Sequence, residues 1–252
     1  MIGAAFHEIL YRPLFNALIA LYEYAAFSDL GIAIVLLTIL IRILLYPLFS
    51  KSARSQAVMQ KIQPQIKKIQ EDHKSDREKQ SRALLDLYKT NNVNPFSGIF
   101  LLLVQLPILI ALYRVFLSEL TPAAFAALYA FIPAPEAINF SFLGLINLHE
   151  RSTMVAIAAA GAQYIHGKCA LPKQSTGNAG ADMIGRQMIV LAPVITLFVL
   201  WGLPSAIGIY WLTSSFVSVI QQVRLNRIMA LAHGGDEHNR SRPQSPSDAG
   251  GH

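Results

Sequence analysis

Five apolar segments constrain the fold of this chain more than any other feature. In chain order they cover residues 30–49, 96–117, 153–167, 187–203 and 205–223. A helix of about 20 apolar residues crosses the roughly 30 Å hydrocarbon core of a bilayer, and the shorter third and fourth segments would cross it upright or where it is thinned. Only 14% of the residues are charged, against about 25% in a soluble domain. The sequence therefore predicts an all-α membrane protein, a five-span helical bundle.

The basic residues predict how these spans are oriented. Most of the 21 Lys and Arg fall in three connections, residues 51–95, 168–186 and 223–252. Because cytoplasmic loops carry an excess of Lys and Arg, we place these connections in the cytoplasm, with the N-terminus outside and the C-terminus inside. The net charge of +6 is then explained by the basic residues of the cytoplasmic connections and does not indicate nucleic-acid binding.

Two segments beside the first span are predicted to be peripheral helices. Residues 1–29 contain Pro13 and Glu23, which favour an amphipathic helix on the outer face over a sixth span. Residues 50–95 carry apolar side chains at helical spacing on both sides of a polar "DHKSD", which predicts a cytoplasmic two-helix hairpin. A solvated linker, held inside by its charges, is the alternative.

Three further connections complete the chain. Residues 118–152 are a predicted outer loop, whose apolar run 122–132 is too short to cross and is predicted to be interfacial or re-entrant. Residues 168–186 are a predicted flexible cytoplasmic loop. Residues 224–252 are a predicted cytoplasmic tail, disordered from His233 because it is polar and nearly free of aliphatic residues.

Arg42 lies inside the first apolar segment, where a charged side chain costs about 2.5–3.5 kcal/mol by insertion scales. None of the five predicted spans contains Asp or Glu to neutralise it. Intramembrane charges that are not paired usually face a water-filled cavity. We therefore predict a hydrated recess, open to the cytoplasm, with Arg42 on its wall roughly 10 Å deep. A structural or snorkelling arginine is the alternative.

Polar residues in the other spans are candidates for the same wall. Thr38 is one helical turn outward from Arg42 on the same face. The others are Gln105, Gln163, Tyr210, Trp211, Thr213, Ser214, Ser215 and Ser218. Each also has a simpler interpretation: Gln163 bonding a backbone group, or Trp211 anchoring at the interface. Such a recess would receive polar segments of a crossing polypeptide. Acidic residues of that polypeptide would be attracted to Arg42. One cysteine and no clustered histidines predict neither a disulfide nor a metal or cofactor site.

Four stretches in this order resemble the YidC family of membrane protein insertases. They are "GIAIVLLTILIRILLYPL", "IQPQIKKIQ", "LLDLYKTNNVNPFSGIFLLLVQLPILIALYRVF" and "PSAIGIYWLTSSFVSVIQQ", and the resemblance extends from about Phe6 to Arg227. An apolar run with one arginine is common, but the ordered set of all four is specific. The chain lacks the large outer domain of Gram-negative members, so we expect the short form.

The resemblance implies a hydrophilic groove that is closed outside and open to the cytoplasm and lipid. Arg42 matches the groove arginine, Thr38 the polar position before it, Gln163 the third-span glutamine and Trp211, beside Tyr210, the last-span aromatic. Client helices would leave along residues 99–117 and 188–203. The implied activity is insertion and folding of membrane proteins without nucleotide, in the bacterial cytoplasmic (inner) membrane. The implied partners are nascent membrane proteins, the ribosome, the Sec translocon, signal recognition particle components and the lipid bilayer, with no direct nucleic-acid readout.

Other function classes fit the residues less well. An intramembrane aspartyl protease needs two Asp in its spans, and "HERST" has Thr153 where a zinc protease needs a second His, so we expect no enzyme. A small anion transporter would use Arg42 but predicts an internal repeat, and we find none. A passive ribosome or chaperone tether has no need of Arg42.

Overall fold

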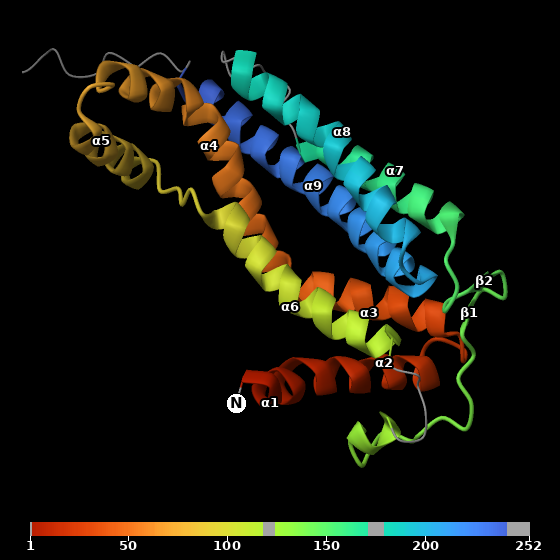
Figure 1. Ribbon diagram of the computed structural model, residues 1–252. Helices are drawn as coiled ribbons and strands as arrows, with labels where there is room; N and C mark the ends of the chain where they lie inside the picture. The colour runs from red at the N-terminus through yellow and green to blue at the C-terminus, as the bar shows by residue number, and fades with distance from the viewer. Residues whose placement is uncertain (1, 118–123, 171–178, 241–252) are drawn as a thin grey trace, which may run out of the picture.

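The computed structural model describes residues 2–117, 124–170 and 179–240, and they are predominantly helical, as predicted (Figure 1). The predicted loops and tail that fall on residues 118–123, 171–178 and 241–252 lie outside the described residues. The elements are α1 (Ile2–Phe6), the π-helix η1 (His7–Tyr11), α2 (Arg12–Tyr24), α3 (Leu30–Leu44), α4 (Tyr46–Asp72), α5 (Arg77–Thr90), α6 (Ser97–Leu117), the 3₁₀ helix η2 (Ala124–Ala127), β1 (Ser141–Phe142), β2 (Ile146–Asn147), α7 (Thr153–Ala170), α8 (Ala179–Trp201) and α9 (Ser205–Arg240).

The N-terminal helices form one side of the core. α2 buries one face, which includes Phe15, Leu18 and Ile19, and it packs against α3 and α6. The segment after η2 is held to α2 by Asn16, whose side chain donates to Ala127 O and accepts from the Tyr129 N–H. This part of the apolar run 122–132 therefore packs on α2. Its position relative to the membrane stays a prediction.

The predicted first span is divided between two helices. α3 ends at Leu44, and α4 begins at Tyr46 in a direction bent by 61°. Pro47 lies in the first turn of α4; it has no N–H to continue the helix, and its ring would clash with the carbonyl of Ile43. Residues 46–49, predicted to end the span, therefore belong to the helix that leads into the α4–α5 hairpin.

A small hairpin, formed by β1 and β2, joins the N-terminal ends of α3 and α9. The Asp29 carboxylate caps α3 by accepting from the Ile32 N–H, and it also accepts from the Leu143 N–H in the hairpin turn at 2.7 Å. On the other side the Ser205 hydroxyl, at the start of α9, donates to Asn147 O. The sequence predicted only a loop here. The hairpin fixes the distance between the two helices at this end.

α7, α8 and α9 run side by side, and α9 also packs against α3, α4 and α6 (Figure 1). α9 continues as a helix to Arg240, whereas composition predicted disorder from His233. Adding a residue to an existing helix costs little compared with nucleating one. The sequence has no proline from the start of α9 to residue 242, so no proline interrupts this helix.

The number of spans stays a prediction. Judged by length and hydropathy, one described helix, Ser205–Met229, is able to cross a membrane alone, and α3 and α4 together are a second, bent candidate. Leu103–Phe116 and Gln187–Trp201 are shorter apolar helices. α4 and α5 pack against each other across a short turn, with Asp76 as the N-cap of α5; their location in the cytoplasm is also a prediction.

Candidate functional site

Arg42 lies in the last turn of α3 and is partly buried. Its Nε donates to the hydroxyl oxygen of Ser214 on α9 at 3.0 Å, and its Nη2 donates to the same oxygen. None of the ion pairs among the described residues involves Arg42. The hydroxyl accepts from two of the five N–H donors of the guanidinium, and because it is neutral it does not offset the charge. The positive charge therefore remains available to an anionic partner.

The backbone of Arg42 is also tied to α9. Because α3 ends at Leu44, the Arg42 carbonyl has lost its helical partner. It accepts instead from the side-chain amide of Gln221 at 3.2 Å. Ser214 and Gln221 are two turns apart on α9, so this helix holds both the head group and the backbone of Arg42.

Tyr210 and Gln105 extend this polar contact toward α6. The Gln105 amide donates to the Tyr210 hydroxyl, and Tyr210 is only 3% exposed. Tyr210 lies one turn before Ser214 on the same face of α9. Arg42, Gln105, Tyr210 and Ser214 thus form one set of polar residues from α3, α6 and α9, which we call the Arg42 cluster.

Gln163 and Trp211 form a separate set. The Gln163 Oε1 on α7 accepts from the Trp211 indole N–H at 2.9 Å and from the Thr196 hydroxyl on α8 at 2.6 Å. Gln163 therefore bonds side chains of two neighbouring helices, and Trp211 has a hydrogen-bond partner inside the bundle. Trp211 follows Tyr210 and points about 100° further around α9. The predicted wall is thus divided into the Arg42 cluster and this α7–α8–α9 contact.

Thr38 contributes to neither set. Its hydroxyl donates to the Ile34 carbonyl of its own helix at 2.6 Å, and the side chain is 1% exposed. It lies among the buried apolar residues of α3. The structure does not bring Thr38 into hydrogen-bond contact with Arg42, and its role in a groove stays a prediction.

Three polar residues near these contacts were not predicted: Thr196, His166 and Gln221. Gln221 Oε1 and His166 Nε2 are buried and have no hydrogen-bond partner among the described residues. Gln221 contacts Arg42 through its hydrogen bond, and His166 on α7 lies within electrostatic range of the same arginine. A buried polar atom without a partner costs about 1–3 kcal/mol, so such atoms usually meet a water or a ligand. The signal was present in the sequence, since each lies in or at the edge of a predicted span.

Comparison with known proteins identifies the family. Residues 21–232 match the model of the family described as "60Kd inner membrane protein". The chain belongs to this family. Curated relatives named membrane protein insertase YidC include those of Geobacter sulfurreducens (30% identical over 235 residues, 92% of this chain and 40% of the relative) and Francisella tularensis subsp. novicida (32% over 203 residues, 81% and 33%). The resemblance predicted from the four motifs is confirmed.

The relatives are longer than this chain. A third relative with the same name, from Nitratidesulfovibrio vulgaris, is 30% identical over 225 residues, which are 88% of this chain and 39% of the relative. The chain thus spans about 40% or less of the length of these three curated relatives.

Proposed function

We propose that this chain is a membrane protein insertase and chaperone. It receives polar segments of nascent membrane proteins in a hydrated groove beside Arg42 and releases their helices sideways into lipid, without nucleotide. The observation that carries the proposal is that Arg42, within an apolar helix, bonds the Ser214 hydroxyl and no carboxylate among the described residues. Membership of a family whose relatives are named insertases supports it.

The contact with Ser214 suggests how a client is captured. A hydrogen bond between a guanidinium and a carboxylate is roughly twice as strong as one between neutral groups. Ser214 is a neutral acceptor, whereas a client carboxylate also neutralises the guanidinium charge, so in this proposal an acidic residue of a client displaces Ser214 from Arg42. His166 Nε2 and Gln221 Oε1 have no hydrogen-bond partner among the described residues, and they offer bonds to a client backbone or to water.

The groove lowers the barrier to crossing by physical means alone. Water that reaches Arg42 thins the low-dielectric layer, and the energy of a charge falls steeply as the effective dielectric constant rises. Polar residues continue along α9 after Ser214, and they make the wall of the proposed groove hydrophilic: Ser215, Ser218, Gln221 and Gln222. No nucleotide is needed for a step that only removes a barrier.

Release into lipid is assigned to the exposed apolar faces of α6 and α8. On α6 these are Phe100, Leu103, Leu106 and Ile110; on α8 they are Met188, Leu191, Val194, Ile195 and Phe198, which is 83% exposed. They fall within the predicted exit path, residues 99–117 and 188–203. A client helix gains the same apolar contacts along these faces as in the surrounding acyl chains.

The partners and orientation belong to the same proposal. With the N-terminus outside and the C-terminus inside, the α4–α5 hairpin lies in the cytoplasm, where it meets the ribosome, the Sec translocon or signal recognition particle components. The family's description as an inner membrane protein supports this location.

Reconstitution tests the proposal directly. The full chain, alone in liposomes, should insert a short Sec-independent client without nucleotide, measured as the client fraction protected from added protease. Liposomes without the protein give the background. If folded protein never raises protection above that background, the insertase proposal fails.

Labelling tests the groove independently. Single cysteines replace Ser218, which is 4% exposed in the structure, and Phe216, which is 59% exposed, in a Cys169→Ser background. The two positions have almost the same depth on α9, but only Ser218 faces the proposed groove. Membrane-impermeant maleimide added from the cytoplasmic side should react at position 218 and not at 216. Protection at both positions would contradict a hydrated groove.

A further inference from the structure

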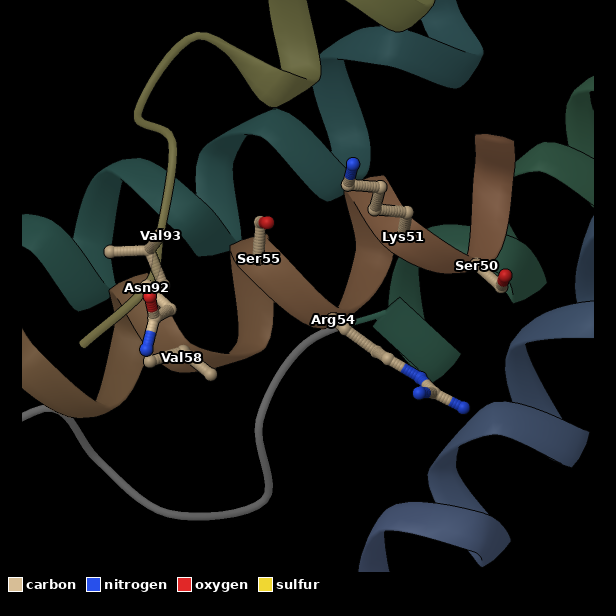
Figure 2. Close-up of a pocket in the computed structure, with 7 residues that line it drawn as sticks. All are labelled: Ser50, Lys51, Arg54, Ser55, Val58, Asn92 and Val93. Carbon is tan, nitrogen blue, oxygen red and sulfur yellow. The ribbon is translucent and has the colours of Figure 1, made fainter. Parts of the chain in front are cut away.

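A cavity of about 320 Å³ lies at the base of α4, where the chain returns from α5 toward α6 (Figure 2). Two rows of α4 side chains line it, because residues four apart share a helix face. Ser50, Arg54 and Val58 form one row, and Lys51 and Ser55 form the next. Asn92 and Val93, from the segment between α5 and α6, lie across from α4.

The lining is cationic and its charges are unused. Lys51 and Arg54 are exposed, and neither side chain makes a hydrogen bond or ion pair with another described residue. No acidic residue is among those that line the cavity. Ser55 and Asn92 add a hydroxyl and an amide donor. Every charged group at this site therefore attracts an anion, and a guanidinium with an ammonium suits phosphate oxygens in particular.

The position of the cavity indicates which molecule supplies that anion. Its residues directly follow the predicted first span, 30–49, and directly precede the predicted second span, 96–117. The cavity therefore lies at the cytoplasmic surface of the membrane, where phosphate is most concentrated in lipid headgroups. Basic pockets at this depth bind anionic headgroups. The volume is at the lower end of the range for small-ligand sites, about 300–1,000 Å³, which fits a headgroup rather than a large ligand.

We propose that this cavity binds the phosphate of an anionic phospholipid. Lys51 and Arg54, which extend to different sides of α4 (Figure 2), supply the positive charge that attracts the phosphate, Ser55 and Asn92 offer donors, and Val58 and Val93 lie toward the less polar glycerol region. The bound lipid fixes the base of the α4–α5 hairpin to the membrane surface. This site rests on the membrane topology given with the proposed function but not on insertase activity, and its test does not measure insertion.

The experiment measures lipid selectivity in the full chain. The protein is reconstituted in phosphatidylcholine vesicles that contain a trace of spin-labelled phosphatidylglycerol or spin-labelled phosphatidylcholine. Electron paramagnetic resonance then gives the relative association of each lipid with the protein. We expect phosphatidylglycerol to be preferred, and Lys51→Gln/Arg54→Gln to reduce that preference by roughly tenfold.

Two further variants control for charge and folding. Lys68→Gln/Arg77→Gln removes the same charges from exposed positions of the same hairpin that do not line the cavity, and it should leave the preference unchanged. Lys51→Arg/Arg54→Lys keeps both charges and should retain it. An equal loss in the Lys68/Arg77 variant, or no preference in the unmodified protein, would overturn the proposal.

Two further measurements test inorganic phosphate and ribosomal RNA as alternative ligands of the cavity. If millimolar inorganic phosphate abolishes the preference at constant ionic strength, the cavity is a soluble-phosphate site and the lipid proposal is wrong. If Lys51→Gln/Arg54→Gln weakens binding of a ribosomal RNA fragment but leaves lipid selectivity intact, the cavity belongs to nucleic acid and the proposal is equally wrong.

Discussion

The Arg42 guanidinium on α3 and the Ser214 hydroxyl on α9 are joined by hydrogen bonds although 172 positions separate them in the chain. Gln221, on the same helix as Ser214, holds the Arg42 carbonyl. The charge is thus fixed in place by neutral groups. This arrangement keeps the guanidinium oriented while leaving its attraction for an anion intact.

The first prediction concerns that charge. Arg42→Ala should slow insertion of a client with an acidic tail by about tenfold, since one lost charge pair in a partly hydrated site is worth at least about 1.4 kcal/mol. A client with a neutral tail should be affected much less, and Arg42→Lys should retain most of the activity. The protease-protected fraction against time, in liposomes, gives the rates for the two clients. Unchanged insertion of both would remove the charge-attraction mechanism.

Ser214 should contribute more to the free energy of unfolding than Ser218, which lies one turn further along α9. Ser214→Ala leaves the Arg42 donors without their described partner, and the free energy of unfolding should fall by about 0.6–2 kcal/mol, the range between typical interhelical bonds in membranes and bonds to charged groups. Ser218→Ala is the control, because that hydroxyl donates only to Ser214 O of its own helix. Unfolding by sodium dodecyl sulfate in mixed micelles compares them. Equal losses in both variants would contradict a specific role for Ser214.

Part of this site could be predicted from the sequence. Arg42 stands out because a lone charge in an apolar helix is costly, and the polar or aromatic residues of the other spans stand out as well: Gln105, Gln163, Tyr210, Trp211 and Ser214. Their pairing could not be predicted. Neighbours such as Tyr210 and Trp211 point about 100° apart, so the rotation of α9 against five other helices decides which of them meets Arg42.

For the fold, too, some features could be predicted from the sequence and others could not. Helical segments follow from the apolar runs, and the resemblance to the family follows from four ordered motifs. The break at Pro47 carried a local signal, but the continuous apolar run 30–49 outweighed it. The strands β1 and β2 have two residues each, too few for an alternating pattern, and they exist because Asp29 and Ser205 hold them from two helices.

Gln163 should couple Thr196 and Trp211. Gln163→Leu removes the acceptor of both and leaves one buried donor, Thr196, and one partly buried donor, Trp211, unpaired, so it should destabilise the protein more than Thr196→Val or Trp211→Phe alone. In the Thr196→Val/Trp211→Phe background the same Gln163→Leu change should cost under about 1 kcal/mol, because replacing all partners by apolar groups is nearly neutral. The comparison is a thermodynamic cycle on unfolding free energies. Additive effects would mean that the three residues act independently.

The N-terminus of α5 should depend on pH. The Asp76 carboxylate accepts from the Lys79 N–H at 3.0 Å, and this bond lowers the pKa of Asp76. A lowered pKa means that the carboxylate stabilises the helix at pH values above its ordinary pKa, about 3.9, and that this contribution is lost as pH falls through the lowered value. Amide exchange in the first turn of α5, corrected for intrinsic rates, should rise below about pH 4. Asp76→Asn keeps an N-cap acceptor without the titration, and a matching rise in that variant would contradict the assignment.

Gly208 should be required for the close approach of α9 to α7. A methyl group added there would lie 2.7 Å from Val155 Cγ1, closer than two carbons pack. Because interiors cannot absorb such a clash freely, Gly208→Ala should destabilise the protein by about 1–3 kcal/mol, and Val155→Ala should restore part of the loss. Gly161→Ala is the matched control on α7: nothing lies within 4 Å of its added carbon, so alanine should be neutral or stabilising by up to about 1 kcal/mol. Thermal unfolding in detergent ranks the three variants. If Gly208→Ala is as stable as Gly161→Ala, α7 and α9 do not approach as closely as the structure places them, and the register that brings Gln163 to Trp211 is in error.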